Sequence, residues 1–278
     1  MTNPPHTYPH GVLCWIDIEK SDPDAAADFY RGLLGWDFHA ATPPDAPDTY
    51  LIATLDGEDA AAIGGGEDGE WMTYVAVDDA DAAAERVTDA GGTVLVPVAD
   101  AGPGGRLAVC ADPDGAVFRL WEADQRLGAQ IANVPGAWNF SILRTADPEA
   151  ALAFYARAFG WTSIGGDPAL GDVMIAVPGY GEHLASTVDP GILERQEFAP
   201  EGFEDVVGGI ARAEGGEPAR WVVQFSIADR AEAIESARRG GGEVVSTRDT
   251  DYTFEAVLRD PQGAEFRVGQ FREPEPAD

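Results

Sequence analysis

The sequence predicts an α+β protein that consists of two tandem domains. Three motifs in the first half of the chain recur in the same order in the second half. Each copy alternates apolar stretches of strand type with stretches that have the 3.6-residue period of a helix. The chain has 278 residues, of which 45% are hydrophobic. It is therefore long enough for two ordinary domains and too apolar for a disordered protein.

The first motif predicts a helix in each half. The pattern Asp-Pro-x-Ala-Ala-x-x-Phe-Tyr-x-x-x-x-Gly-Trp occurs at residues 22–36 and again at residues 147–161. Its Asp can cap the helix, its Pro suits the first helical position, and its Gly suits the left-handed residue that ends a helix. The second Ala, the Phe and the Tyr stand at i, i+3 and i+4, so the Phe-Tyr pair is expected in the core.

The other elements follow in matching order. A strand precedes each helix and short strands follow it; a second strand, a second helix and a hairpin then complete the half. The hairpin turns begin with Asp-Pro and end with Gly, which favours type I geometry. The matching segments of the first and second halves are residues 12–18 with 138–143, 50–55 with 173–177, 72–77 with 222–227, 77–94 with 227–244, and 108–119 with 256–267.

These repeats set the predicted domain bounds. The first domain is expected at residues 9–123 and the second at 137–272, with a linker at 124–136. The second domain carries an insertion around residues 165–220. Each half repeats the order strand, helix, several strands twice, so helices are expected on the convex side of a curved sheet, with the concave face left open.

Composition excludes several classes of partner. The chain has 18 Lys and Arg against 49 Asp and Glu, a formal net charge of −31. Such a charge repels phosphate backbones and anionic headgroups, so neither nucleic acid nor a membrane is expected as a partner.

No apolar run has the roughly 18 residues of a membrane helix. Residues 1–10 have no secretory pattern, and Cys14 and Cys110 form no CxxC. A cytoplasmic protein with reduced thiols is predicted.

Together, the helix motif, a Val-Asp-Asp start to the second helix and an Asp-Pro-x-Gly-Ala-x-Phe strand resemble the vicinal oxygen chelate superfamily. This superfamily includes glyoxalase I, bleomycin-type resistance proteins and extradiol dioxygenases. The similarity spans residues 9–272 and is closest to tandem-domain, glyoxalase-like proteins of actinobacteria. It implies that each domain pairs two βαβββ units into a curved mixed sheet.

The resemblance also implies where a metal ion would be held. Metal-dependent members have a His on the first strand, a His or similar ligand on the fifth and a Glu on the eighth. Indole, thioether, guanidinium and hydrocarbon groups do not hold such an ion, so no metal and no other cofactor is predicted. The corresponding residues are Trp15, Met72 and Arg119 in the first domain and Phe140, Val222 and Arg267 in the second.

Strand alternation predicts the residues that line the concave faces. Aromatic and apolar walls with a few polar groups are typical of sites for organic ligands. Arg119 can bind an oxygen of a ligand or can pair with Asp17; Trp15 and Trp121 can stack on a ligand or belong to the core. The predicted ligand-binding residues are Trp15, Asp17, Met72, Tyr74, Arg119, Trp121, Phe140, Gln224, Arg267 and, in the insertion, Tyr180.

Three functions remain open at this point. The first hypothesis is a metal-free protein, monomer or homodimer, that binds a small aromatic or amphipathic organic molecule, as in antibiotic sequestration or self-resistance. The second is a cofactor-independent lyase, isomerase or hydrolase of secondary metabolism, with Asp17 or His183 as acid or base. The third is a metal-dependent lyase or dioxygenase.

Overall fold

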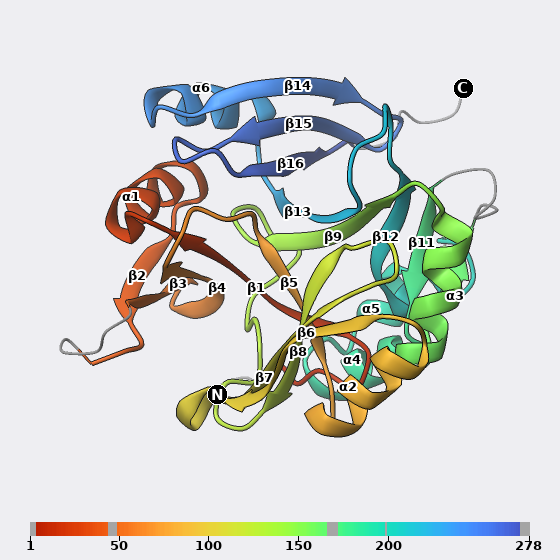
Figure 1. The fold of residues 1–278 in the computed structure, drawn as a ribbon. Helices are drawn as coiled ribbons and strands as arrows, with labels where there is room; N and C mark the ends of the chain where they lie inside the picture. Colours follow the sequence, from red (N-terminus) through yellow and green to blue (C-terminus); the bar gives the residue numbers. More distant parts are fainter. Residues whose placement is uncertain (1–3, 44–48, 166–171, 198, 273–278) are drawn as a thin grey trace, which may run out of the picture. The chain divides into compact units, whose positions relative to one another are not determined.

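The computed structural model describes residues 4–43, 49–165, 172–197 and 199–272. Within them, the first repeat forms a mixed eight-stranded sheet with the strand order β2-β3-β4-β1-β5-β8-β7-β6 (Figure 1). Its elements are β1 (Leu13–Lys20), α1 (Pro23–Leu34), β2 (Asp37–Ala40), β3 (Tyr50–Leu55), β4 (Glu58–Gly65), β5 (Met72–Ala76), α2 (Ala80–Asp89), β6 (Thr93–Asp100), the 3-10 helix η1 (Gly102–Gly104), β7 (Gly105–Ala111) and β8 (Val117–Ala123).

The second repeat forms a sheet of the same topology, in the order β10-β11-β12-β9-β13-β16-β15-β14. The expected α+β architecture of two tandem domains is therefore confirmed. The elements are β9 (Trp138–Thr145), α3 (Pro148–Phe159), β10 (Thr162–Ile164), β11 (Val173–Ala176), α4 (Tyr180–Thr187), α5 (Ile192–Arg195), η2 (Phe203–Asp205), β12 (Val206–Arg212), β13 (Arg220–Ser226), α6 (Arg230–Arg239), β14 (Glu243–Asp249), β15 (Thr253–Arg259) and β16 (Glu265–Phe271).

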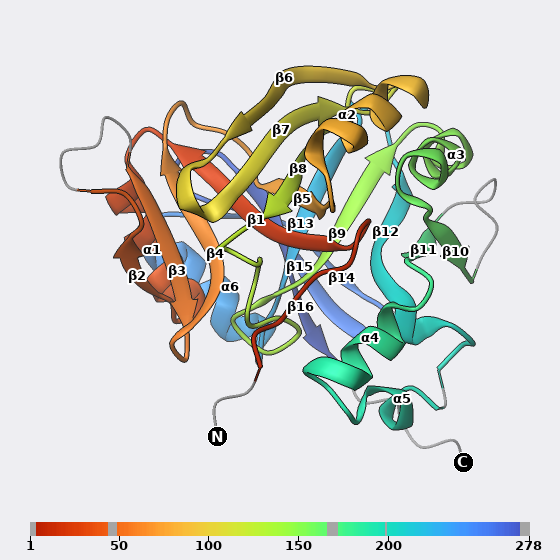
Figure 2. The same ribbon diagram turned by 90° about the horizontal axis from the view of Figure 1, so that it is seen from below.

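The extra elements of the second repeat lie inside the predicted insertion. In the first repeat, β3 and β4 are joined by only Asp56 and Gly57. In the second repeat, α4, α5 and η2 separate β11 from β12, and Figure 2 shows α4 and α5 next to each other. Residues 166–171 and 198, which also belong to the predicted insertion, lie outside the described residues.

The chain folds into two compact units, which cut across the repeats. Strands β1, β5, β9 and β13 each pass from one unit to the other. The predicted domain bounds thus stay a prediction. The first unit comprises Met1–Trp15, Thr73–Gly128 and Ser141–Trp221, and the second comprises Ile16–Met72, Ala129–Phe140 and Val222–Asp278.

The helix motif forms as its residues predict. Asp22 and Asp147 each accept a hydrogen bond from the backbone N–H three residues later, at 3.0 Å. Gly35 and Gly160 end α1 and α3 in the left-handed region, with φ of 77° and 76°. A side chain is strained in this conformation, whereas glycine adopts it freely.

Each compact unit has an aromatic core to which its Phe-Tyr helix contributes. The rings meet mostly edge to face, which is a favourable geometry for aromatic pairs. The predicted burial of both Phe-Tyr pairs is confirmed. The core rings are Phe29, Tyr30, Trp36, Trp71, Phe225 and Phe266 in the second unit, and Phe118, Phe154, Tyr155, Phe159, Trp161 and Trp221 in the first.

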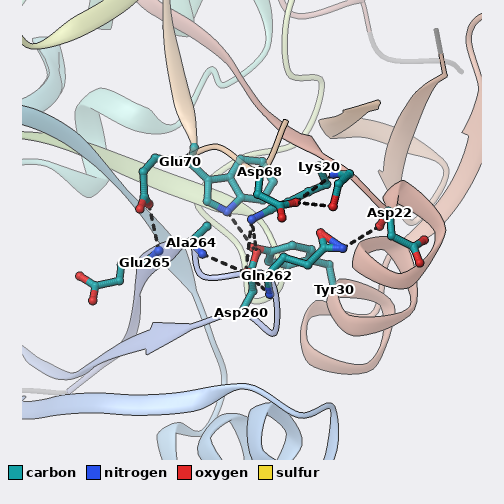
Figure 3. A network of polar contacts seen from close by, with 11 residues as sticks. Lys20, Asp22, Tyr30, Asp68, Glu70, Asp260, Gln262, Ala264 and Glu265 are labelled. Atoms are coloured by element: carbon teal, nitrogen blue, oxygen red, sulfur yellow. Dashed lines mark hydrogen bonds and ion pairs between the residues drawn. The ribbon is translucent and has the colours of Figure 1, made fainter. Parts of the chain in front are cut away.

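A buried ion pair holds the second unit together beside this core. The only lysine of the chain, Lys20, is completely buried and its Nζ lies 2.9 Å from Oδ2 of Asp260, in the turn between β15 and β16 (Figure 3). Tyr30 of α1 donates to the same carboxylate at 3.0 Å, and Trp71 donates to the Tyr30 oxygen at 3.0 Å. The backbone N–H groups of Gln262 and Ala264 also donate to the Asp260 carboxylate.

The first unit has the same arrangement without the cation. Asp112, in the turn between β7 and β8, accepts from Tyr155 at 3.2 Å, and Trp221 donates to that tyrosine at 3.2 Å. Thr145, at the end of β9, stands where the other repeat has Lys20, and it donates to Asp114 at 2.7 Å. Burial raises the pKa of Asp112 above its ordinary value.

Loss of the Lys20 charge should destabilise the protein strongly. Lys20→Met keeps the side-chain volume but leaves Asp260 buried without its cation, so we expect the free energy of unfolding to fall by about 3 kcal/mol. Urea denaturation followed by circular dichroism measures this change. The double variant Lys20→Met/Asp260→Asn should recover part of the loss, because it removes the uncompensated charge.

A matched control is Arg259→Met, which breaks the more exposed ion pairs with Glu243 and Glu265. This substitution should change stability little, because solvent screens such pairs. Equal losses for Lys20→Met and Arg259→Met, or no recovery in the double variant, would contradict a central role for the buried pair.

Candidate functional site

One face of β5, β8 and β7 in the first unit brings together several of the predicted ligand-binding residues. Arg119 pairs with Tyr74 on one side and Val109 on the other, and Trp121 pairs with Leu107. We call these five residues the Arg119 face. Arg119 and Trp121 are partly exposed. Phe118 and Leu120, which alternate with them on β8, are fully buried, and α2 packs against β7 and β8. The alternation predicted from the sequence therefore forms in this unit.

The polar contacts of the Arg119 face hold its cation in place. Nη1 of Arg119 donates to the Tyr74 oxygen at 2.7 Å, and the guanidinium carbon lies 5.4 Å from the centre of the Tyr74 ring. A guanidinium stays charged at all physiological pH values and stacks on aromatic rings. The face thus places a guanidinium against an aromatic ring.

The Trp121 ring is fixed as well. Its Nε1 donates to the carbonyl oxygen of Arg126 at 2.8 Å, and the ring lies edge to face with Tyr74 at 6.2 Å. The close approach of the Trp121 indole to the backbone requires a glycine at position 105. A Cβ on Gly105 would lie 3.0 Å from the indole and 2.3 Å from the carbonyl oxygen of Glu122. Trp15, also in the first unit, is 8% exposed on β1. A preordered indole can stack on a flat ligand without losing rotamer freedom.

The residues present do not fit the metal ion that the resemblance implies. An arginine has five N–H donors and no lone pair to offer, and its charge repels a cation. Trp15 and Met72 offer an indole and a thioether, which are poor ligands for Mn²⁺, Fe²⁺ or Zn²⁺. Among the described residues, no group of three or more His, Cys, Asp or Glu side chains is arranged to hold a metal ion.

Asp17 lies in the second unit and has a partner that sequence reasoning missed. It is 1% exposed, and Tyr50 of β3 donates to its Oδ2 at 3.0 Å. Tyr50 stands opposite Gly64 of β4, where a Cβ would lie 3.5 Å from the Tyr50 ring. A small side chain at position 64 would thus touch the ring at an ordinary van der Waals distance. The alternative pairing of Arg119 with Asp17 stays a prediction.

The second repeat presents a different face in the second unit. Gln224 pairs with Arg267. On β16, Gly269 stands where β8 has Trp121, and a Cβ there would lie 2.9 Å from Nε2 of Gln224. Glu255 of β15 is opposite Gly269. An amide, a glycine and a carboxylate thus replace Tyr74, Trp121 and Leu107. The predicted residue Phe140 is partly exposed on β9 of the same unit.

The predicted residues of the insertion contact the N-terminal segment. Tyr180 and His183 lie three residues apart on α4. The Tyr180 oxygen is 3.2 Å from Nε2 of His6, and Nε2 of His183 is 3.0 Å from the carbonyl oxygen of Thr7. His6 stacks on Tyr8 at 4.2 Å. Neither His6 nor Tyr8 was expected from the sequence, and the roles of Tyr180 and His183 toward a ligand stay predictions.

Three groups at this contact or near it, the half-buried His6 and the buried Tyr180 and Cys14, are neutral at physiological pH. Burial, with a smaller contribution from His183, lowers the pKa of His6 to about 4. Burial raises the pKa of the Tyr180 phenol and of the Cys14 thiol well above their ordinary values. A thiol is nucleophilic as the thiolate, so Cys14 is not an activated nucleophile.

Two family models match this chain. The model of the Glyoxalase/Bleomycin resistance protein/Dioxygenase superfamily matches residues 13–120. The model of a glyoxalase-like domain matches residues 141–269. In addition, no helix of the described residues is long and apolar enough to cross a membrane.

Curated relatives match almost end to end. A putative glyoxylase, CFP32, from Mycobacterium tuberculosis is 33% identical over 270 residues, which cover 94% of this chain and 95% of that protein. The anthracycline biosynthesis protein DnrV from Streptomyces peucetius is 32% identical over 286 residues, with 96% of both chains covered.

Solved structures share the fold at low identity. The Mn(II)-bound glyoxalase from Novosphingobium aromaticivorans has a TM-score of 0.60 at 15% identity, and the match covers 96% of this chain and 84% of that one. A catechol 2,3-dioxygenase has a TM-score of 0.58 at 15% identity, with 98% and 91% covered. At such identity these two likenesses show the fold alone.

Acidification should weaken the attachment of the N-terminal segment. The ordinary pKa of histidine, 6.5, applies to the unfolded chain, whereas His6 has a pKa of about 4 when folded. Between these values the unfolded chain binds a proton that the folded chain does not, so stability falls as the pH falls through this window. Urea denaturation at pH 7 and pH 5 should show a smaller loss for His6→Gln than for wild type.

The control is His39→Gln, because His39 is exposed on β2. This variant should lose as much stability as wild type between the two pH values. If His6→Gln shows the same pH dependence as wild type, the half-buried imidazole of His6 is not the group responsible.

Proposed function

This chain belongs to the glyoxalase/bleomycin resistance protein/dioxygenase superfamily, and from that premise we propose that it binds a small aromatic or amphipathic organic molecule without a metal ion. The ligand lies on the Arg119 face. In the cell, such binding serves antibiotic sequestration or self-resistance. The observation that carries the proposal is that Tyr74 contacts both the Arg119 guanidinium and the Trp121 ring, and that Arg119 stands at a position where the resemblance implies a metal ligand.

The composition of this face supports an organic ligand. Tyr74, Trp121, Val109 and Leu107 supply apolar and aromatic surface, and Arg119 supplies the polar group that orients a ligand. Sites for small molecules combine these two features. The partial exposure of Arg119 and Trp121 leaves their outer surfaces available for contact.

The relatives support an aromatic ligand. DnrV and the related DauV of Streptomyces are both named for anthracycline biosynthesis. Anthracyclines are flat polycyclic aromatic molecules, and a flat ring system can stack on an indole such as Trp121. The net charge of −31 also favours ligands that are neutral or cationic in solution.

A second candidate is a cofactor-independent enzyme of secondary metabolism, and the Asp17–Tyr50 pair favours it. A buried carboxylate that accepts a hydrogen bond from a phenol can exchange a proton with a bound substrate. His183 is the weaker candidate for such a role, because its Nε2 already contacts the carbonyl oxygen of Thr7.

Truncation of Trp121 should weaken ligand binding. Trp121→Ala removes the stacking surface, so we expect affinity for an aromatic ligand to fall at least about tenfold. Native mass spectrometry against a panel of aromatic natural products identifies the ligand, and isothermal titration then measures the dissociation constants. Tyr252→Ala is the control, because Tyr252 is 67% exposed and is not part of β5, β7 or β8. Equal affinity of Trp121→Ala and wild type would argue against this face as the site.

A binding protein should return its ligand unchanged. After prolonged incubation with the identified ligand, chromatography coupled to mass spectrometry should recover only the starting compound, because the proposal assigns no bond-breaking step. Product formation that Asp17→Asn abolishes, while affinity is retained, would instead establish the enzymatic candidate. Product formation that survives both Asp17→Asn and His183→Ala would contradict the proton-transfer roles assigned to these residues.

A further inference from the structure

The orientation of the Trp121 ring depends on a backbone carbonyl that lies beyond the end of β8. Nε1 of Trp121 donates to the carbonyl oxygen of Arg126 at 2.8 Å, so the position of this oxygen orients the indole. The N–H of Arg126 donates to the carbonyl oxygen of Gly104 at 3.1 Å. The Arg126 oxygen, however, belongs to the next peptide plane, whose orientation also depends on the residues that follow.

Gly128 follows two residues later and is tightly enclosed. A Cβ on this glycine would lie 2.8 Å from the ring of Tyr8 and 2.5 Å from the carbonyl oxygen of Cys14 on β1. The φ of Gly128 is 113°, a conformation that glycine adopts freely. The ring of Tyr8 therefore lies against the backbone at the point where the chain leads away from Arg126.

Tyr8 is itself held by its neighbours in the N-terminal segment, residues 6–10. The imidazole of His6 stacks on the Tyr8 ring, with 4.2 Å between the ring centres. Nε2 of His6 lies 3.2 Å from the oxygen of Tyr180 on α4, and His183 of the same helix contacts the next residue of the segment. A continuous series of contacts thus leads from α4 through Tyr8 to the carbonyl that orients the indole.

We propose that, provided the proposed function is correct, Tyr8 is a positioning residue of the ligand site. Through the backbone at Gly128 it restrains the acceptor of the Trp121 indole, and so keeps the ring in an orientation in which a flat ligand can stack on it. Tyr180 and His183 act on the site in the same way, through the N-terminal segment.

The partial exposure of Trp121 gives this restraint its importance. Packing holds a partly exposed ring less firmly than a core side chain, so the hydrogen bond to Arg126 contributes more to its orientation. A restrained indole binds a flat ligand more tightly than a mobile one, because less rotamer freedom is lost on binding.

The second repeat differs at both ends of this series of contacts. The segments before the two repeats correspond at Gly11 and Gly136, whose carbonyl oxygens each accept a hydrogen bond at 2.7 Å from the tryptophan of a helix motif. Three residues earlier, the first segment has Tyr8 and the second has Asn133. The second repeat also has Gly269 where the first has its indole, so the positioning ring and the ring that it positions occur together in one repeat and are replaced together in the other.

Exchange of the Trp121 indole N–H with solvent tests the positioning without a ligand. Nitrogen-15 NMR observes the indole N–H groups of the seven tryptophans, and the signal that is missing from Trp121→Phe identifies Trp121. We expect this N–H to exchange at least about fivefold faster in Tyr8→Ala, because its acceptor is less restrained. Tyr8→Phe keeps the ring and should exchange at the wild-type rate. His6→Ala removes only the stacked imidazole and should give a smaller change in the same direction.

The consequence for binding is measured with doxorubicin, a flat and fluorescent anthracycline that carries a positive charge. Tyr8→Ala should weaken its binding about fivefold, whereas Tyr8→Phe should retain wild-type affinity. In the Trp121→Ala background, Tyr8→Ala should cause no further loss, because a residue that acts through the indole has no effect once the indole is removed. An equal fold loss in both backgrounds would indicate a general structural role and overturn the inference.

His10→Gln is the matched control, because His10 belongs to the same segment but contacts Arg86 of α2 at 3.2 Å. This variant should keep the wild-type exchange rate and affinity, and circular dichroism should confirm that every variant is folded. Unchanged exchange of the Trp121 N–H in both Tyr8→Ala and His6→Ala would overturn the inference and leave the proposed function standing. Equal affinity of Trp121→Ala and wild type for doxorubicin would instead contradict the proposed function, on which the inference rests.

Discussion

The fold of each unit depends on satisfying one buried carboxylate. In the second unit, Asp260 accepts hydrogen bonds from two backbone N–H groups of its own turn, from Tyr30 and from Lys20. These partners come from the end of β1, from α1 and from the hairpin of β15 and β16. A buried charge is costly when any partner is lost, so one carboxylate constrains three elements together.

The first unit meets the same constraint with a different chemistry. Asp112 has its tyrosine and its turn N–H groups, but Thr145 stands where the other repeat has Lys20. Burial raises the pKa of Asp112, so its charged form is less favourable in the folded protein than in water. The turn motif thus constrains the backbone, while the exposed strand faces are free to diverge. The two exposed strand faces differ accordingly. The first repeat has Trp121 two residues after Arg119, whereas the second repeat has Gly269 two residues after Arg267.

The sequence predicts those parts of the structure that rest on local patterns. The caps and ends of α1 and α3, the Asp-Pro turns and the tandem repeats follow from short motifs, and the pairing of Tyr74 with Arg119 follows from the two-residue period of strands. Contacts between segments that are distant in the sequence do not follow from such local patterns. The hydrogen bond from Tyr50 to Asp17 joins β3 to β1, and no local pattern of the sequence indicates it. No signal in the sequence indicates the contact of His6 with Tyr180, because this contact joins a Pro-rich terminal segment to an inserted helix.

Global and local electrostatics act on a ligand at different distances. This difference makes an arginine compatible, as the polar group of the proposed site, with so acidic a protein. At physiological ionic strength, charges farther away than about 8 Å are largely screened, so the excess of 49 acidic over 18 basic residues acts mainly on the approach of a charged molecule. At contact, the nearest groups dominate, and in the proposed site these include the guanidinium of Arg119 and the phenol of Tyr74 that accepts its hydrogen bond. A molecule that is neutral in solution and polarisable at contact satisfies both conditions.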